Sequence, residues 1–484
     1  MLKWIETLVT RARAAVAEPV SSARRAEDFK KLGNKFLADG DFGKAEECYR
    51  QSIAASPGFA DAYIALGFVL LKQERLSDAK HCLKQAASLD PDEADSHYLL
   101  GAISQKQNEP GEAIENFSRA LEVNPRFVEA HHGLGVVFRI QGRLDEAMRC
   151  FDEALSLRPD FAESRFNKSL ILLMRGDFVE GLELFESRVG LDTTEQLADW
   201  SAFLSGHPEM RRWRGDALEG KRLLIWTEEG LGDCLMAMRY LPKLAERGAG
   251  RILVLSDPSL ARLLKTFPMV NEVTSRADLL SSGSFDVHCP IMSLPYAFAT
   301  RSDTIPNAVP YLSVPHEMRR KWSETLSGLN GPRVGLVWRG GKKYGRDFLR
   351  SLSLQRLGPL TEIAGVSFVS LQKGEAAGEL AGSDRPILDR MGECGDFLDT
   401  AALVANLDLV ISVDTSVAHL AGALGKPVWL LNRFESEWRW QLGREDSPWY
   451  PTMRIFRQPA LDDWDSVVKR VAGELARFAR SGAA

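Results

Sequence analysis

Small and apolar residues recur at a fixed interval through the first half of the chain. Four prolines lie at positions 57, 91, 125 and 159, so successive prolines are 34 residues apart. Between them lie a Leu-Gly pair, then an alanine, then a large apolar residue four positions later. These positions are Leu66-Gly67, Leu100-Gly101 and Leu134-Gly135, then Ala79, Ala113 and Ala147, then Leu83, Phe117 and Phe151. Because residues four apart share one face of a helix, the pattern predicts pairs of closely packed amphipathic helices.

A period of 34 residues is that of tetratricopeptide repeats. An earlier unit spans residues 26–59. A fifth, degenerate unit begins near Ala162, keeps Phe185 and lacks a closing proline. One repeat cannot bury its apolar face alone, so residues 26–192 are predicted to stack into a solenoid of four clear repeats and one degenerate repeat.

The inner groove of this solenoid is expected to be lined by positions of the first helix of each repeat. They form a mixed acidic and aromatic surface: Asp61, Ile64, Phe68, Asp95, Tyr98, Glu129, His132 and Arg139. The surface has no recurring asparagine ladder that would clamp a peptide backbone. A groove that binds a protein partner is the leading interpretation, and a spacer with a purely structural role is the alternative.

Beyond residue 220 the helical period gives way to short apolar runs that alternate with helical segments. Seven runs predict buried strands: 222–226, 251–255, 285–289, 333–338, 366–371, 407–413 and 427–431. Strands that alternate with helices form parallel, doubly wound sheets. We therefore predict a linker (193–220) and two Rossmann-like α/β domains, 221–315 and 316–484, that face a cleft. The second domain ends in a helix, and which sheet that helix covers stays open.

Residues 1–25 are predicted to hold an amphipathic helix that packs on the next domain or, alternatively, contacts a membrane surface or a partner. Charged residues interrupt its apolar run, so it is neither a secretory signal nor a membrane span, and no other stretch is long enough to cross a bilayer. The 484 residues carry a net charge of −5, so no overall basic field recruits nucleic acid. Six cysteines without metal-ligand spacing indicate reduced thiols, as in a cytoplasmic protein.

Open parallel sheets bind ligands at the carboxyl ends of their strands, so the residues that follow the predicted strands are the candidates. After 222–226 come Gly230 and Gly232, which allow a tight turn with a close backbone approach. Asp233 falls at the opening of the next helix. Its carboxylate is either a cap for the helix N-terminus or a catalytic group, and both interpretations stay open.

Two strand ends in the second domain predict an anion site. A basic, glycine-rich loop follows 333–338, and a helix whose free N–H groups would hold a diphosphate follows 407–413. The candidates are Arg339, Gly340 and Lys342 in the loop, and Asp414, Thr415, Ser416 and His419 at the helix. A solvated run of charges is the alternative for the loop, and a well-capped helix is the alternative for the second segment.

Three segments in combination resemble a known family: "EEGLGDCLMAMRYLP" (228–242), "SVDTSVAHLAGALGKPVWLL" (412–431) and 438–458. They are similar to GT-B glycosyltransferases of the heptosyltransferase type (family 9), and the whole chain resembles bacterial proteins that join tetratricopeptide repeats to such a domain. The resemblance implies transfer of a sugar from a nucleotide-sugar donor held by the C-terminal domain to an acceptor held by the N-terminal one.

The resemblance also implies roles for individual residues. Asp233 would be the general base, the segment from Asp414 to His419 would bind the donor, and Lys342 or Arg339 would neutralise the diphosphate. With those groups in place, an inverting transfer needs neither a metal nor another cofactor.

The leading hypothesis is a cytoplasmic glycosyltransferase whose repeats recruit a protein acceptor, with flagellin as an example. Gly341 and Tyr344 stand where relatives carry Asn and His. This departure favours the alternative of a non-catalytic scaffold, whose degenerate GT-B domain binds protein partners or a nucleotide sugar. A third hypothesis, heptose transfer to lipopolysaccharide, does not explain the function of the repeats. Trp438 and Trp440 would stack on the ligand or be buried in the core.

Overall fold

The computed structural model describes residues 21–191, 210–228, 230–276, 283–341 and 347–481. Most of the predicted N-terminal amphipathic helix (1–25) and much of the predicted linker lie outside these residues. The chain divides into two compact units, Met1–Ser164 and Arg165–Ala484.

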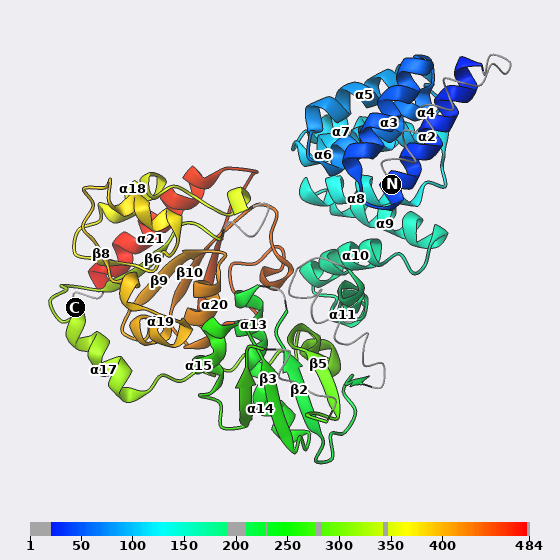
Figure 1. The fold of residues 1–484 in the computed structure, drawn as a ribbon. Coiled ribbons are helices and arrows are strands. Elements are labelled where there is room, and N and C mark those ends of the chain that lie inside the picture. The colour runs from blue at the N-terminus through cyan, green and yellow to red at the C-terminus, as the bar shows by residue number, and fades with distance from the viewer. Residues whose placement is uncertain (1–20, 192–209, 229, 277–282, 342–346, 482–484) are drawn as a thin grey trace, which may run out of the picture. The chain divides into compact units, whose positions relative to one another are not determined.

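The first unit is built from antiparallel helix pairs that stack in chain order (Figure 1). Its helices are α2 (Ser22–Ala38), α3 (Phe42–Ala55), α4 (Ala60–Lys72), α5 (Leu76–Leu89), α6 (Ala94–Lys106), α7 (Pro110–Val123), α8 (Val128–Ile140) and α9 (Leu144–Leu157). The predicted helical solenoid is thus confirmed.

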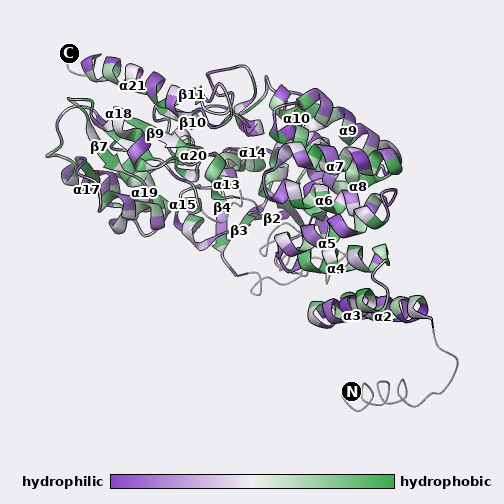
Figure 2. Cartoon of the chain, turned by 90° about the horizontal axis from the view of Figure 1, so that it is seen from above, coloured by the Kyte–Doolittle hydropathy of each residue, from purple (hydrophilic) through white to green (hydrophobic). Residues whose placement is uncertain are grey.

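The repeated glycines set how closely the two helices of each pair approach. A Cβ added to Gly67 would lie 2.6 Å from Cγ of Leu83, and one on Gly135 would lie 2.6 Å from the ring of Phe151. A side chain larger than hydrogen therefore cannot fit between the paired helices. Hydrophilic and hydrophobic residues alternate along these helices (Figure 2), as expected where one face of each helix is buried.

The fifth helix pair packs within the second unit. It consists of α10 (Ala162–Arg175) and α11 (Phe178–Phe185), followed by the 3-10 turn η1 (Glu186–Gly190). The ring of Phe178 lies 6.1 Å from Trp449, and that of Phe185 lies 5.8 Å from Trp438. The compact units therefore divide near Ser164, inside α10, whereas the repeat pattern places the end of the solenoid at 192.

The first sheet of the second unit is fully parallel, in the order β1-β5-β2-β3-β4. Its strands are β1 (Arg211–Arg212), β2 (Arg222–Trp226), β3 (Arg251–Leu255), β4 (Val270–Thr274) and β5 (Val287–Pro290). The helices between them are α13 (Leu231–Ala237), α14 (Leu241–Glu246) and α15 (Ala261–Leu264), and α16 (Leu294–Ala297) follows β5.

The second sheet is also parallel, in the order β11-β10-β9-β6-β7-β8. Its strands are β6 (Arg333–Val337), β7 (Ser367–Ser370), β8 (Ile387–Asp389), β9 (Leu409–Val413), β10 (Val428–Asn432) and β11 (Met453–Arg457). The accompanying helices are α17 (His316–Thr325), α18 (Gly358–Thr361), α19 (Phe397–Val404), α20 (Ser416–Ala423) and α21 (Trp464–Ser481).

Two parallel sheets with intervening helices are consistent with a GT-B-like α/β fold, as the sequence predicts. The C-terminal helix α21 packs against α18 and β11, so within the described residues it covers the second sheet. Helix α13 of the first sheet packs directly against α20 of the second (Figure 1). Because both helices follow the carboxyl ends of strands, this contact joins the two predicted ligand-binding edges.

Candidate functional site

The α13–α20 contact is close because position 232 has no side chain. A Cβ on Gly232 would lie 2.7 Å from Cδ2 of His419 and 3.4 Å from Cα of Ser416. Gly230, by contrast, has φ −77° and ψ 156°, a conformation open to any residue. The close backbone approach that the sequence predicts is therefore made at Gly232, where the start of α13 meets the start of α20.

Asp233 has both a capping contact and an ion pair. Its Oδ2 accepts a hydrogen bond from the Gly230 N–H at 3.3 Å, which helps to satisfy the start of α13. Its Oδ1 forms an ion pair with Arg439, and the Asp233 side chain is 16% exposed. Burial raises the pKa of Asp233 above its usual range, against the opposing effect of the Arg439 guanidinium.

His419 lies in a buried aromatic cluster. Its ring stacks on Trp440, with 5.1 Å between the centroids, and its Nδ1 is 3.0 Å from the Tyr450 hydroxyl. Its Nε2 is 3.9 Å from Oδ1 of Asp414. Burial lowers the pKa of His419 well below its usual value, and the guanidinium groups of Arg439, Arg239 and Arg350 lower it further. The imidazole is therefore neutral at physiological pH.

Arg239 supports this cluster from the first sheet. It lies on the 3-10 turn η2 (Met238–Tyr240) and is 4% exposed. Its guanidinium donates to the Trp449 carbonyl at 2.5 Å and is 4.6 Å from the centre of the Tyr450 ring. A buried arginine with these contacts fixes the segment that carries Trp449 and Tyr450 against η2.

The N-terminus of α20 has no side-chain cap, and of its first-turn N–H groups that of Ala418 donates to the Thr415 carbonyl at 3.0 Å. Thr415 is its N-cap, yet no side-chain cap hydrogen bond forms, because the Thr415 hydroxyl is 3.1 Å from Oγ of Ser412 instead. The backbone N–H groups of the first turn, which begins at Ser416, therefore receive no side-chain cap. Such a helix end can bind an anion.

The basic loop after β6 reaches α20 through Arg350. The Arg350 guanidinium donates to the Asp414 carbonyl at 2.9 Å and pairs with Asp347 at 2.9 Å. A Cβ on Gly340 would lie 2.0 Å from Oδ1 of Asp347, so a larger residue there would displace the Asp347 carboxylate from its contact with Arg350. Arg339 pairs with Glu379 at 3.3 Å. Lys342 lies outside the described residues.

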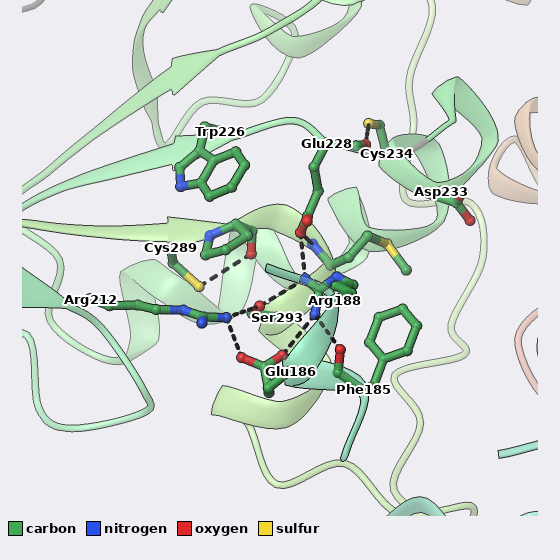
Figure 3. Close-up of polar contacts among 12 residues, drawn as sticks. Phe185, Glu186, Arg188, Arg212, Trp226, Glu228, Asp233, Cys234, Cys289 and Ser293 are labelled. Atoms are coloured by element: carbon green, nitrogen blue, oxygen red, sulfur yellow. Dashed lines mark hydrogen bonds and ion pairs between the residues drawn. The ribbon is translucent and has the colours of Figure 1, made fainter. Parts of the chain in front are cut away.

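A buried charge cluster ties the fifth helix pair to the carboxyl end of the first sheet (Figure 3). Arg188 of η1 pairs with Glu228 at 2.5 Å, and these side chains are 2% and 0% exposed. Arg188 also donates to Oγ of Ser293 at 2.9 Å and pairs with Glu186 at 3.0 Å. Arg212 forms an ion pair with the same Glu186. No local pattern predicts this cluster, because Arg188, Glu228 and Ser293 are far apart along the chain.

Carboxylates recur in the first turn of the first helices α4, α6, α8 and α10, whereas the first turn of α2 has none. They are Asp61, Asp95, Glu129 and Glu163. Burial raises the pKa of Asp95, and the neighbouring charges of Asp61 and Glu129 add to the effect. The successive carboxylates are therefore close enough to repel one another.

The other predicted groove residues have contacts of their own. Tyr98 lies 4.9 Å from the Phe127 ring, and the Nδ1 of His132 lies 3.0 Å from Oγ of Ser164. Burial lowers the pKa of His132 to about 4. Phe68 lies under the ammonium group of Lys72 at 5.3 Å. Arg139 is part of α8 and is partly buried.

In the described ranges of the chain, no three His, Cys, Asp or Glu side chains gather in a way that could hold a metal ion. No helix in the same ranges has the length and apolar character needed to span a membrane.

Comparison with known proteins identifies both parts of the chain. Tetratricopeptide repeat profiles match residues 36–103, 105–160 and 141–193. The profile of glycosyltransferase family 9 (heptosyltransferase) matches residues 385–462. The chain therefore joins tetratricopeptide repeats to a C-terminal glycosyltransferase family 9 domain. The matched segment includes His419 and Arg439 and leaves Asp233 outside.

Among individual proteins, the chain is similar to Protein FlbA of Caulobacter vibrioides. The two are 32% identical over 322 residues, which cover 61% of this chain and 53% of FlbA. The chain thus spans about half the length of this curated relative.

Solved structures of repeat proteins also match. MamA is 24% identical over 36% of this chain and 97% of its own, with a TM-score of 0.30. YrrB, described as a TPR protein with an unusual peptide-binding site, is 23% identical over 36% and 91%, with a TM-score of 0.29. Likeness of this strength says nothing of function.

Proposed function

We propose that this protein is a glycosyltransferase that moves a sugar from a nucleotide-sugar donor to a protein acceptor recruited by the repeats. The observation that carries the proposal is the contact of α13 with α20. It sets a carboxylate, Asp233, beside a helix N-terminus that can bind an anion. An inverting transfer needs this pairing of a base with a diphosphate site.

In the proposed reaction, the acceptor hydroxyl oxygen attacks the anomeric carbon of the donor sugar and forms the new bond. The bond from that carbon to the diphosphate oxygen breaks, and its electron pair leaves with the diphosphate. Asp233 takes the proton of the acceptor hydroxyl. The N–H groups at the start of α20 and the nearby Arg350 stabilise the leaving diphosphate, so the reaction is proposed to be metal-independent.

His419 would orient this site. It is buried and neutral, and it contacts Tyr450 and Trp440. These contacts support a role in holding the start of α20 in place against α13. The arginine side chains would then neutralise the charge of the diphosphate directly.

For the acceptor, we propose a basic protein segment that lies along the solenoid. Repeat solenoids bind partners in their grooves, and the carboxylates in the first turns of α4, α6 and α8 support a positively charged partner. A flagellin-type acceptor is one candidate. We place the reaction in the cytoplasm, which is consistent with cysteines that form no disulfide among the described residues.

The experiment is to supply a panel of nucleoside diphosphate sugars and to measure nucleotide release. We expect release by the wild type from one member of the panel and a loss of roughly 100-fold or more in Asp233→Asn, since general bases contribute that much. Asp465→Asn is the matched control, because its side chain is 87% exposed, and it should behave as wild type. Equal rates of nucleotide release by wild type and Asp233→Asn would refute the catalytic role of Asp233.

For the acceptor, the test is the salt dependence of capture. Asp95→Lys should weaken binding of a basic acceptor, and raised salt should weaken wild-type binding too. Glu122→Lys introduces the same change of charge on α7, where its side chain is 65% exposed, and should bind as wild type. Salt-independent binding would contradict a basic partner.

A second candidate function is a non-catalytic scaffold. One observation favours it: the Asp233 carboxylate is already paired with Arg439. The family resemblance also implies Asn and His at the positions where this chain has Gly341 and Tyr344. This candidate predicts that partners bind but that no sugar in the panel is turned over. Nucleotide release that depends on Asp233 would exclude it.

A further inference from the structure

Arg439 has a position that neither the sequence motifs nor the family match explains. Its guanidinium contacts the Asp233 carboxylate across the two sheets. The same side chain lies 3.4 Å from Glu437 and 4.9 Å from the centre of the Trp438 ring. Its chain neighbour Trp440 stacks on His419. Arg439 therefore lies beside the start of α20, where the proposed diphosphate would bind.

The residues on either side of Arg439 are held firmly. Trp438 is 2% exposed and packs against Phe185 and Trp449, and Trp440 is fully buried. The main chain of this turn is thus anchored on both sides. A guanidinium on a long side chain can still change partners while that backbone stays in place.

Several charged groups face Asp233. Arg439 and Glu437 come from the segment before β11, Asp414 comes from the end of β9, and the neutral His419 packs against the adjacent Gly232. Glu437 and Asp414 raise the pKa of Asp233, and Arg439 is the counter-ion that opposes them and burial. Loss of Arg439 would therefore make the carboxylate a stronger base.

We propose that Arg439 is a diphosphate ligand that masks Asp233 until the donor binds. A diphosphate carries more charge than one carboxylate and offers a guanidinium two phosphate groups to bridge. When the donor enters, Arg439 moves from Asp233 to the diphosphate. Asp233 then loses its counter-ion only in the complex that is ready to react. This inference rests on the proposed function, because it assumes a diphosphate at α20.

The test uses inorganic pyrophosphate as the probe and the full chain as the protein. Calorimetric titrations in buffers of different ionisation enthalpy, at pH values between about 5 and 7, give the affinity and the number of protons exchanged. As Arg439 leaves Asp233, the pKa of the carboxyl should rise, so that at the acidic end of this range it takes up part of a proton from the buffer, while at the alkaline end it stays ionised and able to act as the base. The wild type should therefore take up more protons than Asp233→Asn, in which the proton exchange of pyrophosphate itself remains.

The affinity arm asks whether Arg439 contacts pyrophosphate. Arg439→Gln alone would leave the buried Asp233 carboxylate without its ion pair, and a weaker affinity could then not be told from misfolding. The substitution is therefore made in the Asp233→Asn background. There it should weaken pyrophosphate binding roughly tenfold, and Arg439→Lys should recover part of the loss. Thermal melting of each variant reports the fold separately.

Three results would overturn the proposal: equal proton uptake by wild type and Asp233→Asn, unchanged affinity on replacing Arg439, or no measurable binding of pyrophosphate to the wild type. The two proposals can fail independently. Normal sugar transfer with unchanged pyrophosphate affinity removes only the role of Arg439. Pyrophosphate binding with the expected proton uptake, but without transfer from any donor, removes only the proposed activity.

Discussion

Replacing Arg188 with alanine should destabilise the second unit more than any surface substitution. The Arg188–Glu228 pair is almost fully buried, with side chains 2% and 0% exposed. Removing one partner of such a pair leaves a charge without compensation in a dry environment, which costs about 3–5 kcal/mol. Loss of the contact with Oγ of Ser293 acts in the same direction. We therefore expect a reduction of about this size in the free energy of unfolding.

Denaturant titration followed by tryptophan fluorescence suits this test, because all of the 11 tryptophans except Trp4 lie in Arg165–Ala484. Arg251→Ala is the control, since its pair with Glu272 is half exposed and should contribute at most about 1 kcal/mol. Replacing both charges, as Arg188→Met with Glu228→Leu, should recover much of the loss. If Arg188→Ala costs no more than Arg251→Ala, the fifth helix pair is not held by this cluster.

Gly232→Ala should push α13 away from His419, which should lower the free energy of unfolding by about 1–3 kcal/mol and reduce nucleotide release. Gly328→Ala is the control, because a Cβ there meets open space, and it should change neither quantity. Equal melting temperatures for the two variants would contradict this packing. Tyr450→Phe removes the contact with His419 and should lower the free energy of unfolding by about 1 kcal/mol; an unchanged denaturation midpoint would refute it. Burial lowers the pKa of His132 to about 4, so the unfolded chain binds a proton at this residue more readily than the folded chain. The free energy of unfolding of the first unit should therefore fall by about 2 kcal/mol as the pH falls from 7 to 5. His132→Gln should flatten this pH dependence in circular-dichroism melts.

Much of the fold is predictable from the sequence because its signals are local. The 34-residue period identifies the helix pairs, and each of the seven apolar runs overlaps a strand, from β2 to β10. The strands that the pattern missed are β1, β4, β8 and β11. Each is an end strand of its sheet, and most are short or partly exposed, so they lack a continuous apolar run.

The candidate site was less predictable because its contacts are long-range. The motifs indicate Asp233 and the start of α20, since both follow strand ends. Nothing local indicates that Arg439 pairs with Asp233 or that Arg350 bonds to the Asp414 carbonyl. The fifth repeat also packs on distant aromatic residues, Trp438 and Trp449, which its repeat pattern does not indicate.

The central claim is that this chain transfers a sugar to a protein that its repeats bind. The most direct test is intact-mass spectrometry of proteins captured by the full chain, after incubation with the nucleotide-sugar panel. A captured protein should gain the mass of a sugar residue with wild type and gain none with Asp233→Asn. Capture of the same protein without a gain in mass from any donor would contradict the claim.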